Sequence, residues 1–145
     1  MIVRNYMKKL TLIFCLIFTA SASSQTLSFR CNFTGGQITD YDSGNPKTKR
    51  VNDFVELVYD QIDKSKSTAR LIGNVGVAQV QAIEGNESIH LIETTPFGNM
   101  NITTVFFTEK SKLNGRYPVV HSRHMKSSSG PLPQQYIGLC KELLQ

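Results

Sequence analysis

The densest group of reactive side chains in the sequence is the run His121, Ser122, Arg123 and His124. We expect this run at the end of a strand, where successive side chains point to opposite faces of a sheet. His121 and Arg123 then share one face, while Ser122 and His124 share the other. A zinc site on the two histidines is disfavoured, because zinc also needs a third protein ligand. A nucleophilic pair of Ser122 with the adjacent His121 is disfavoured as well, because neighbouring side chains on a strand point to opposite faces and Ser122 lies in none of the strained turns that expose a catalytic serine. We therefore predict no catalytic group, no metal site and no cofactor.

Glu93 joins this group by the same alternation. In the predicted strand 88–95, it lies on one face with the apolar residues two and four positions before it. In the predicted strand 117–123, His121 and Arg123 likewise share a face with apolar residues. If those apolar residues mark the interior, a carboxylate and two cationic side chains point inward together, and buried charges need partners.

Two interpretations of this inward group stay open. The first is a structural salt bridge between Glu93 and Arg123, with His121 close enough to be affected by their charges. The second is an anion-binding group inside a ligand cavity, because the planar fork of an arginine holds a carboxylate or a phosphate well. Glu93, His121 and Arg123 are therefore the candidate binding residues.

Short runs of alternating apolar and polar residues, separated by turn-forming residues, predict about eight strands. They cover residues 27–34, 51–62, 68–72, 77–83, 88–95, 100–108, 117–123 and 135–140. The segment 51–62 also fits an amphipathic helix, but its β-branched and aromatic residues favour a strand. We expect Gly35 and Gly36 to end the first strand. Segments 40–49 and 126–131, rich in turn formers, are expected to be an exposed loop and a mobile loop.

Two cysteines, Cys31 and Cys140, flank almost the whole strand array. In an exported chain such a pair favours a disulfide over free thiols or metal ligands. Closing so long a loop stabilises the folded state by about 4–5 kcal/mol in the chain-entropy model. With short connections, including the Asn114-Gly115 pair typical of a type I′ turn, the fold class is all-β. We predict one antiparallel meander, a small barrel or sandwich closed by a disulfide between the first and last strands.

Residues 1–22 have the pattern of a signal peptide. Basic residues precede the apolar run 10–18, and the segment ends in Ala-Ser-Ala. A start at Met7 would give a more compact leader of the same type. The apolar run is shorter than the about 20 residues that a membrane-spanning helix needs. We therefore expect a secreted or periplasmic protein without a membrane span, whose mature part, residues 23–145, is a single domain.

The basic character of the chain comes largely from the leader. The formal net charge is +5, with 16 basic and 11 acidic residues. The leader holds three of the basic residues and none of the acidic ones, so the mature part carries only about +2. Nucleic-acid binding needs basic residues gathered on one face with aromatics among them. Here they are scattered among acidic and hydroxyl residues, so nucleic acid is not an expected partner.

Four short motifs are spread over the mature chain. They are Cys31-x-Phe33, Ile92-Glu93, Ser122-Arg123-His124 and Gln135-Tyr136-Ile137-Gly138-Leu139-Cys140. Together they resemble a group of small, uncharacterised exported bacterial β-proteins. The resemblance implies export, a single domain and a role for these residues, but no particular reaction. The expected architecture is also loosely similar to lipocalin-like and avidin-like barrels, although the chain has no tryptophan and so lacks the Gly-x-Trp signature of lipocalins.

These observations favour a binding module over an enzyme. The expected partner is a small anionic ligand or another protein, such as a hydrolase that the module inhibits. A structural or envelope-associated role is the main alternative. A hydrolase-type enzyme that uses His121, His124 and Glu93 is a further one, although it lacks a recognisable nucleophile. A cavity inside the barrel would favour small-ligand binding, whereas a filled interior would favour recognition through the surface.

Overall fold

The described part of the chain is built from strands. The computed structural model describes residues 26–41, 44–52, 55–108 and 113–144. No helix long and apolar enough to cross a membrane occurs among these residues. The predicted signal peptide, residues 1–22, lies outside them.

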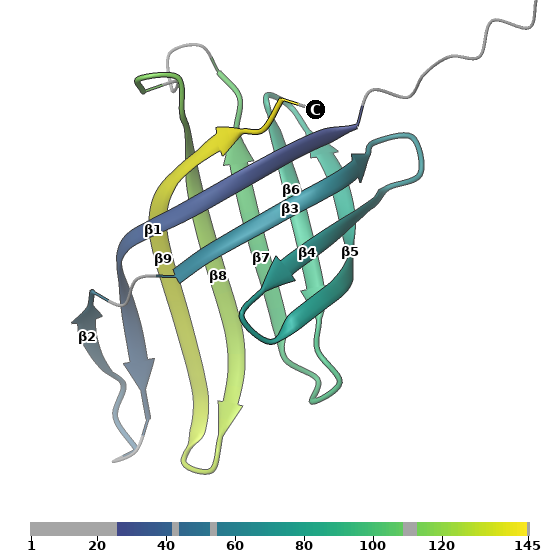
Figure 1. Ribbon diagram of the computed structural model, residues 1–145. Coiled ribbons are helices and arrows are strands. Elements are labelled where there is room, and N and C mark those ends of the chain that lie inside the picture. The colour runs from purple at the N-terminus through teal and green to yellow at the C-terminus, as the bar shows by residue number, and fades with distance from the viewer. Residues whose placement is uncertain (1–25, 42–43, 53–54, 109–112, 145) are drawn as a thin grey trace, which may run out of the picture.

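The strands form one antiparallel sheet that closes on itself (Figure 1). They are β1 (Leu27–Asp40), β2 (Lys47–Val51), β3 (Val55–Asp63), β4 (Thr68–Gly73), β5 (Gly76–Gly85), β6 (Ser88–Thr94), β7 (Met100–Phe106), β8 (Tyr117–Ser127) and β9 (Gly130–Glu142). Each strand from β3 onward pairs with the next, and β9 returns to pair with β1. This closes an eight-strand barrel with β2 as an extra strand. Cys31 and Cys140 lie directly opposite each other in the β1–β9 ladder and form a disulfide, so the predicted fold class and disulfide are confirmed.

Strand β1 does not end at Gly35 and Gly36, contrary to the prediction. It continues to Asp40, and its second half pairs with β2 after its first half has paired with β3. A bulge in the β1–β9 ladder between Phe33 and Gly35 bends the strand at this point. A Cβ atom on Gly36 would clash with the backbone oxygen of Gln135 and lie 2.7 Å from Cδ1 of Tyr136, so the glycine makes room for the backbone and the ring of β9. The glycines therefore bend the strand instead of ending it.

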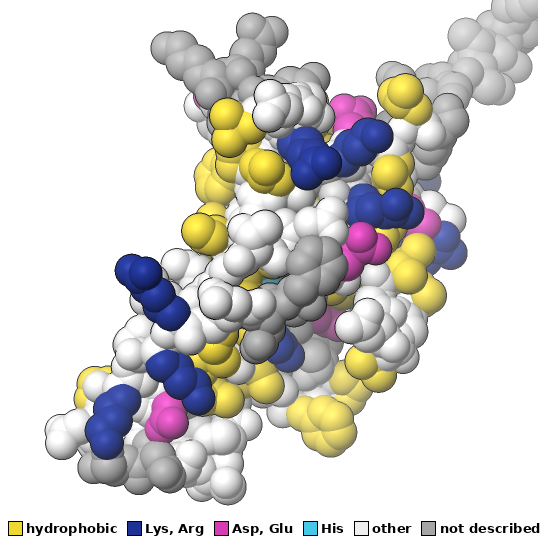
Figure 2. All heavy atoms as spheres, turned by 60° about the vertical axis from the view of Figure 1, so that its left-hand side comes forward, with side chains coloured by type: hydrophobic (Ala, Val, Ile, Leu, Met, Phe, Trp, Pro, Cys, Tyr) yellow, Lys and Arg dark blue, Asp and Glu magenta, His cyan; other side chains and the backbone are white. Residues whose placement is uncertain are grey.

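The segment 40–49 is not a loop throughout. Strand β2 begins at Lys47 and forms a two-stranded ribbon with the second half of β1, in which the hydroxyl oxygens of Thr39 and Thr48 lie 2.8 Å apart. The ribbon forms because β1 extends beyond the end of its ladder with β3. The edge of β1 that β3 leaves unpaired is the one that β2 pairs with. Figure 2 shows Lys and Arg side chains over this ribbon, at the lower left of the face, with an acidic side chain among them, and charges of both signs over the rest of that face.

The segment 126–131 was expected to be a mobile loop, and this expectation was wrong. Strand β8 runs to Ser127 and β9 begins at Gly130, so a two-residue turn joins two paired strands. The Ser127 hydroxyl donates to the Gly130 carbonyl oxygen at 3.0 Å. Hydroxyl side chains support tight turns in this way. The run of small residues is therefore a hairpin turn.

The segment 51–62 contains a strand, so the predicted strand is confirmed and the alternative, an amphipathic helix, is not formed. Val51 ends β2, and β3 covers Val55–Asp63. Its ladder with β4 shifts register between Asp60 and Asp63, and Gln61 at this bulge has φ of 50°. The bulge turns both Tyr59 and Ile62 into the interior, although a regular strand would direct them to opposite faces. This accounts for the three-residue spacing of Tyr59 and Ile62, which resembles a helical pattern.

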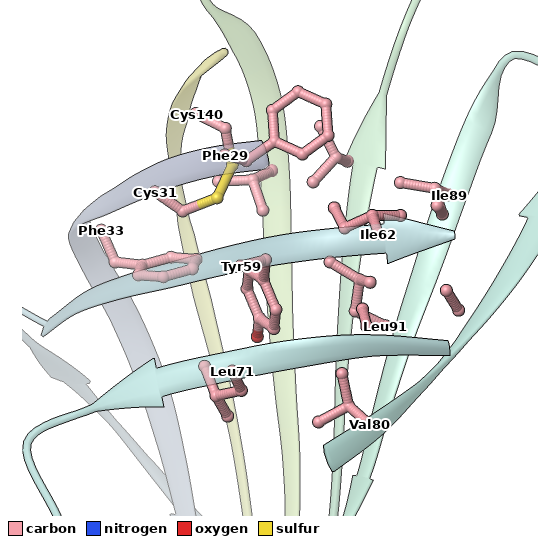
Figure 3. Packing of buried hydrophobic residues seen from close by; sticks show 14 of the residues in the cluster. Phe29, Cys31, Phe33, Tyr59, Ile62, Leu71, Val80, Ile89, Leu91 and Cys140 are labelled. Atoms are coloured by element: carbon pink, nitrogen blue, oxygen red, sulfur yellow. A yellow bond between two sulfur atoms is a disulfide. The ribbon is translucent and has the colours of Figure 1, made fainter. Parts of the chain in front are cut away.

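One end of the barrel is filled by apolar side chains (Figure 3). The fully buried members include Phe29, Phe33, Ile62, Ile89, Leu91, Val105 and Val119, together with both cysteines. Phe107 and Tyr117 pack against Phe29, with ring centroids 5.8 and 6.0 Å from that of Phe29. Burial of these side chains stabilises the fold, and polar side chains join the inner wall toward the other end of the barrel.

Candidate ligand-binding site

The inner wall of the barrel changes from apolar to polar in successive rungs along β6–β9. The pairing registers place Ile89, Val105, Val119 and Gly138 in the first rung, Leu91, Thr103, His121 and Tyr136 in the second, and Glu93, Asn101, Arg123 and Gln134 in the third. Residues two positions apart on a strand point to the same side, so the three rungs share the inner side of the wall. The third rung lies next to the mouth that the β4–β5 and β6–β7 turns surround.

A half-open cavity of about 540 Å³ occupies this end of the barrel. Its apolar lining comes from Leu57, Leu71, Val75, Val77, Ala78, Pro96 and Phe97, and its polar lining includes Glu93, Asn101, His121, Arg123 and Tyr136. Small-molecule sites in proteins have this size and this mixture, in which a largely apolar wall carries a few polar groups.

The three candidate residues Glu93, His121 and Arg123 all line this cavity, so the strand alternation placed them on the correct side. The direct bridge between Glu93 and Arg123 is not formed, because no nitrogen of the arginine lies within 4.0 Å of a carboxylate oxygen of the glutamate. The physical reason is the strand order. Strand β7 lies between β6 and β8, so two strand spacings, about 10 Å, separate the two backbones.

Glu93 and Arg123 each have a different partner. Asn101 Nδ2 donates to Glu93 Oε2 at 2.6 Å, and Arg123 Nη1 donates to Gln134 Oε1 at 3.2 Å. The Tyr136 hydroxyl also donates to Gln134 Oε1, at 2.9 Å. Asn101 and Gln134 both lie in the third rung, directly across from Glu93 and Arg123, so neighbouring strands hold both charged side chains against the wall.

His121 belongs to a buried chain of hydrogen bonds in the second rung. The Thr103 hydroxyl oxygen lies 2.7 Å from His121 Nδ1 and 2.6 Å from the Tyr59 hydroxyl oxygen. Burial, with a smaller contribution from the Arg123 charge, lowers the pKa of His121 to about 4. Burial also raises the pKa of the Tyr59 phenol. Both groups are therefore neutral at pH 7, and Arg123 is the cation that the cavity wall presents.

Two polar groups in the third rung retain unused hydrogen-bonding capacity. Asn101 is 91% buried, and its Oδ1 atom has no hydrogen-bond partner among the described residues. Arg123 uses one N–H group for Gln134, and no other hydrogen bond from its guanidinium is formed within the described part of the chain. Buried polar atoms are normally satisfied by protein or water, so these groups are where a bound molecule would make its polar contacts.

The structure does not bring His124 to this cavity. His124 is exposed and, with Ser122, lines a different groove beside Gln37 and Gln135. The catalytic combination of His121, His124 and Glu93 therefore lacks one member at the site. Across the ranges that the structure describes, no group of three or more His, Cys, Asp or Glu side chains is arranged to hold a metal ion.

Sequence reasoning missed several residues of the polar wall. Asn101 and Thr103 alternate in phase with the buried Val105, which is the same signal that identified Glu93, so they could have been found. Tyr59 could not, because the bulge in β3 breaks the alternation. Gln134 lay just before the predicted last strand, which in the structure begins earlier, at Gly130.

Comparison of the chain with protein-family models and with curated proteins finds no match. The resemblance to small exported bacterial β-proteins therefore remains an expectation from the motifs.

Proposed function

We propose that this protein is an exported binding module that holds a small amphipathic ligand in the open mouth of its barrel. The observation that carries the proposal is the half-open cavity of about 540 Å³ whose mostly apolar wall presents Arg123.

The ligand is expected to have an anionic group and an apolar part. Arg123 keeps guanidinium N–H groups for a carboxylate or a phosphate, and arginine binds such groups through paired hydrogen bonds. Leu57, Leu71 and Val77 form part of the wall on which the apolar part would be buried. Such burial contributes about 25 cal/mol for each Å² removed from water.

Export is supported by the cysteine pair. The disulfide joins Cys31 and Cys140, which are 109 residues apart in sequence, and disulfides form and persist in oxidising compartments. Together with the leader pattern of residues 1–22, this favours a secreted or periplasmic location.

A second candidate function is recognition of a protein partner by the rim of the mouth. Val75 and Phe97, on the β4–β5 and β6–β7 turns, are 104% and 92% exposed. Aromatic side chains at such positions often anchor protein interfaces. The same residues line the cavity, so a partner bound there would cover its entrance.

The test uses isothermal titration calorimetry of the purified, oxidised protein with octanoate and octyl phosphate, and with octanol as the uncharged control. We expect both anions to bind and octanol to bind weakly. Arg123→Gln should weaken anion binding at least about tenfold, because a charge-assisted hydrogen bond is lost. Lys126→Gln, an exposed cation on the same strand, should have no effect. Anion binding unchanged by Arg123→Gln would refute the assignment.

The position of the ligand can be checked independently of charge. Ala78 lines the cavity, and Ala78→Phe should fill part of it and reduce binding without removing any polar group. If Ala78→Phe leaves affinity unchanged while the protein remains folded by circular dichroism, the ligand binds elsewhere.

A further inference from the structure

The cavity wall carries two opposite charges that do not neutralise each other directly. Glu93 and Arg123 both line the cavity, yet they stand on strands β6 and β8 with β7 between them. We infer that the ligand is a zwitterion with an apolar side chain, of the size of an amino acid or a dipeptide. This inference rests on the proposed function and specifies the chemistry of its ligand.

The acceptor side of the wall is formed by Glu93 and Asn101. One carboxylate oxygen of Glu93 accepts from Asn101, and no other described residue donates to this carboxylate. Asn101 Oδ1, beside it, is a buried acceptor without a donor. One of the two Asn101 amide N–H groups donates to Glu93, so the groups left for a ligand at this side are mainly acceptors, the Glu93 carboxylate and Asn101 Oδ1. A simple fatty acid has no hydrogen-bond donor for them, whereas an ammonium group has three and a compensating charge.

The donor side of the wall is Arg123. Its position directly across from Asn101 in the β7–β8 ladder places the guanidinium next to the acceptor side but on the following strand. Gln134 holds one N–H group, and the His121 ring beside it is neutral at pH 7. The carboxylate of a ligand would therefore pair with Arg123. No other Lys or Arg is found among the described residues that line the cavity.

The spacing and the lining suit a molecule with both charges close together and an apolar side chain. About 10 Å separates the backbones of β6 and β8. Because the side chains of Glu93 and Arg123 extend inward from a curved wall, the distance between their charged groups is shorter than that. One residue of extended chain spans up to about 3.6 Å. Leu57, Leu71 and Phe97 line other parts of the cavity and would contact the apolar side chain.

The inference is tested by titrating the oxidised protein with four probes that differ in charge. They are L-phenylalanine, the dipeptide Leu-Phe, N-acetyl-L-phenylalanine, which lacks the ammonium group, and L-phenylalaninamide, which lacks the carboxylate. We expect one of the two zwitterions to bind at least about tenfold more tightly than either single-charge probe, since each charge gains a partner.

Variants assign the two charges. Glu93→Gln should remove the preference for the zwitterion over N-acetyl-L-phenylalanine, whereas Arg123→Gln should weaken both. Glu87→Gln, at an exposed glutamate in the β5–β6 turn, serves as the matched control and should change neither. Retention of the preference in a folded Glu93→Gln protein would overturn the role of Glu93.

The outcomes separate this inference from the proposed function. If N-acetyl-L-phenylalanine or octanoate binds the wild-type protein as tightly as both zwitterions, the zwitterion inference is wrong and the anion-binding function stands. If no probe binds, including octanoate and octyl phosphate, both are wrong. The comparison of probes on the wild-type protein decides the matter even if a variant fails to fold.

Discussion

Protonation of His121 should make the folded protein less stable as the pH falls from about 6.5 to about 4. The folded-state pKa of His121 is lowered to about 4 by burial and by the Arg123 charge, whereas an unfolded histidine titrates near 6.5. Between these values the unfolded chain binds a proton that the folded chain does not. The stabilisation is therefore complete above about pH 6.5 and is lost as the pH falls toward the folded pKa.

The size of this effect follows from the difference between the two pKa values. Each pH unit in the window corresponds to about 1.4 kcal/mol, so the unfolding free energy should drop by about 3 kcal/mol over the whole interval. This is a large part of the about 5–15 kcal/mol that usually stabilises a domain.

Urea unfolding followed by circular dichroism at several pH values from 4 to 7.5 measures the effect. The perturbation is His121→Asn, which keeps a polar atom near the position of Nδ1 for the hydrogen bond to Thr103 but does not titrate. The difference in unfolding free energy between wild type and variant should change by about 3 kcal/mol across the window, because carboxylate titrations are common to both and cancel. The exposed His124→Gln is the control and should show no such change.

A constant difference between wild type and His121→Asn across this pH range would refute the reasoning, since it would mean that His121 titrates alike in both states. The second cause of the shift can be checked separately by NMR titration of the His121 ring. Arg123→Gln removes the nearby charge, so the pKa of His121 should rise in that variant but stay below 6.5 because burial remains.

Three further predictions concern the framework of the barrel. Replacing Cys31 and Cys140 together by alanine should lower the unfolding free energy by about 4–5 kcal/mol in denaturant titrations, because the unfolded chain regains the closed loop's freedom. Gly138→Ala should disrupt the β1–β9 ladder and lower the melting temperature, because a Cβ there overlaps the backbone of β1, whereas Gly73→Ala, whose Cβ would meet nothing closer than 3.8 Å, should be tolerated. Phe29→Ala should cost about 3–5 kcal/mol in the same titrations, since this fully buried ring leaves a cavity.

Much of the fold could be predicted from the sequence because strand alternation, turn composition and cysteine position are local signals. Asn114 and Gly115 have φ of 48° and 73°, the left-handed values that the type I′ turn requires. Alternation likewise placed Glu93, His121 and Arg123 on the inner side of the sheet. The errors came where a local signal has two structural meanings. Gly35 and Gly36 can end a strand or bend it, and here the pairing of this stretch with β9 and β2, which are distant in sequence or follow a turn, continues the strand.

The sequence by itself determined which face points inward for strands without a bulge, such as β6, β7 and β8, because a period of two residues follows from the geometry of an extended backbone. It could not determine which inward residues meet. Only the register and the order of the strands decided that Glu93 binds Asn101 and that Arg123 binds Gln134, with β7 between the two charges. Closure of β9 onto β1 then produced a barrel filled at one end and open at the other. Contacts between strands distant in sequence depend on the packing of the whole chain, which no local pattern encodes.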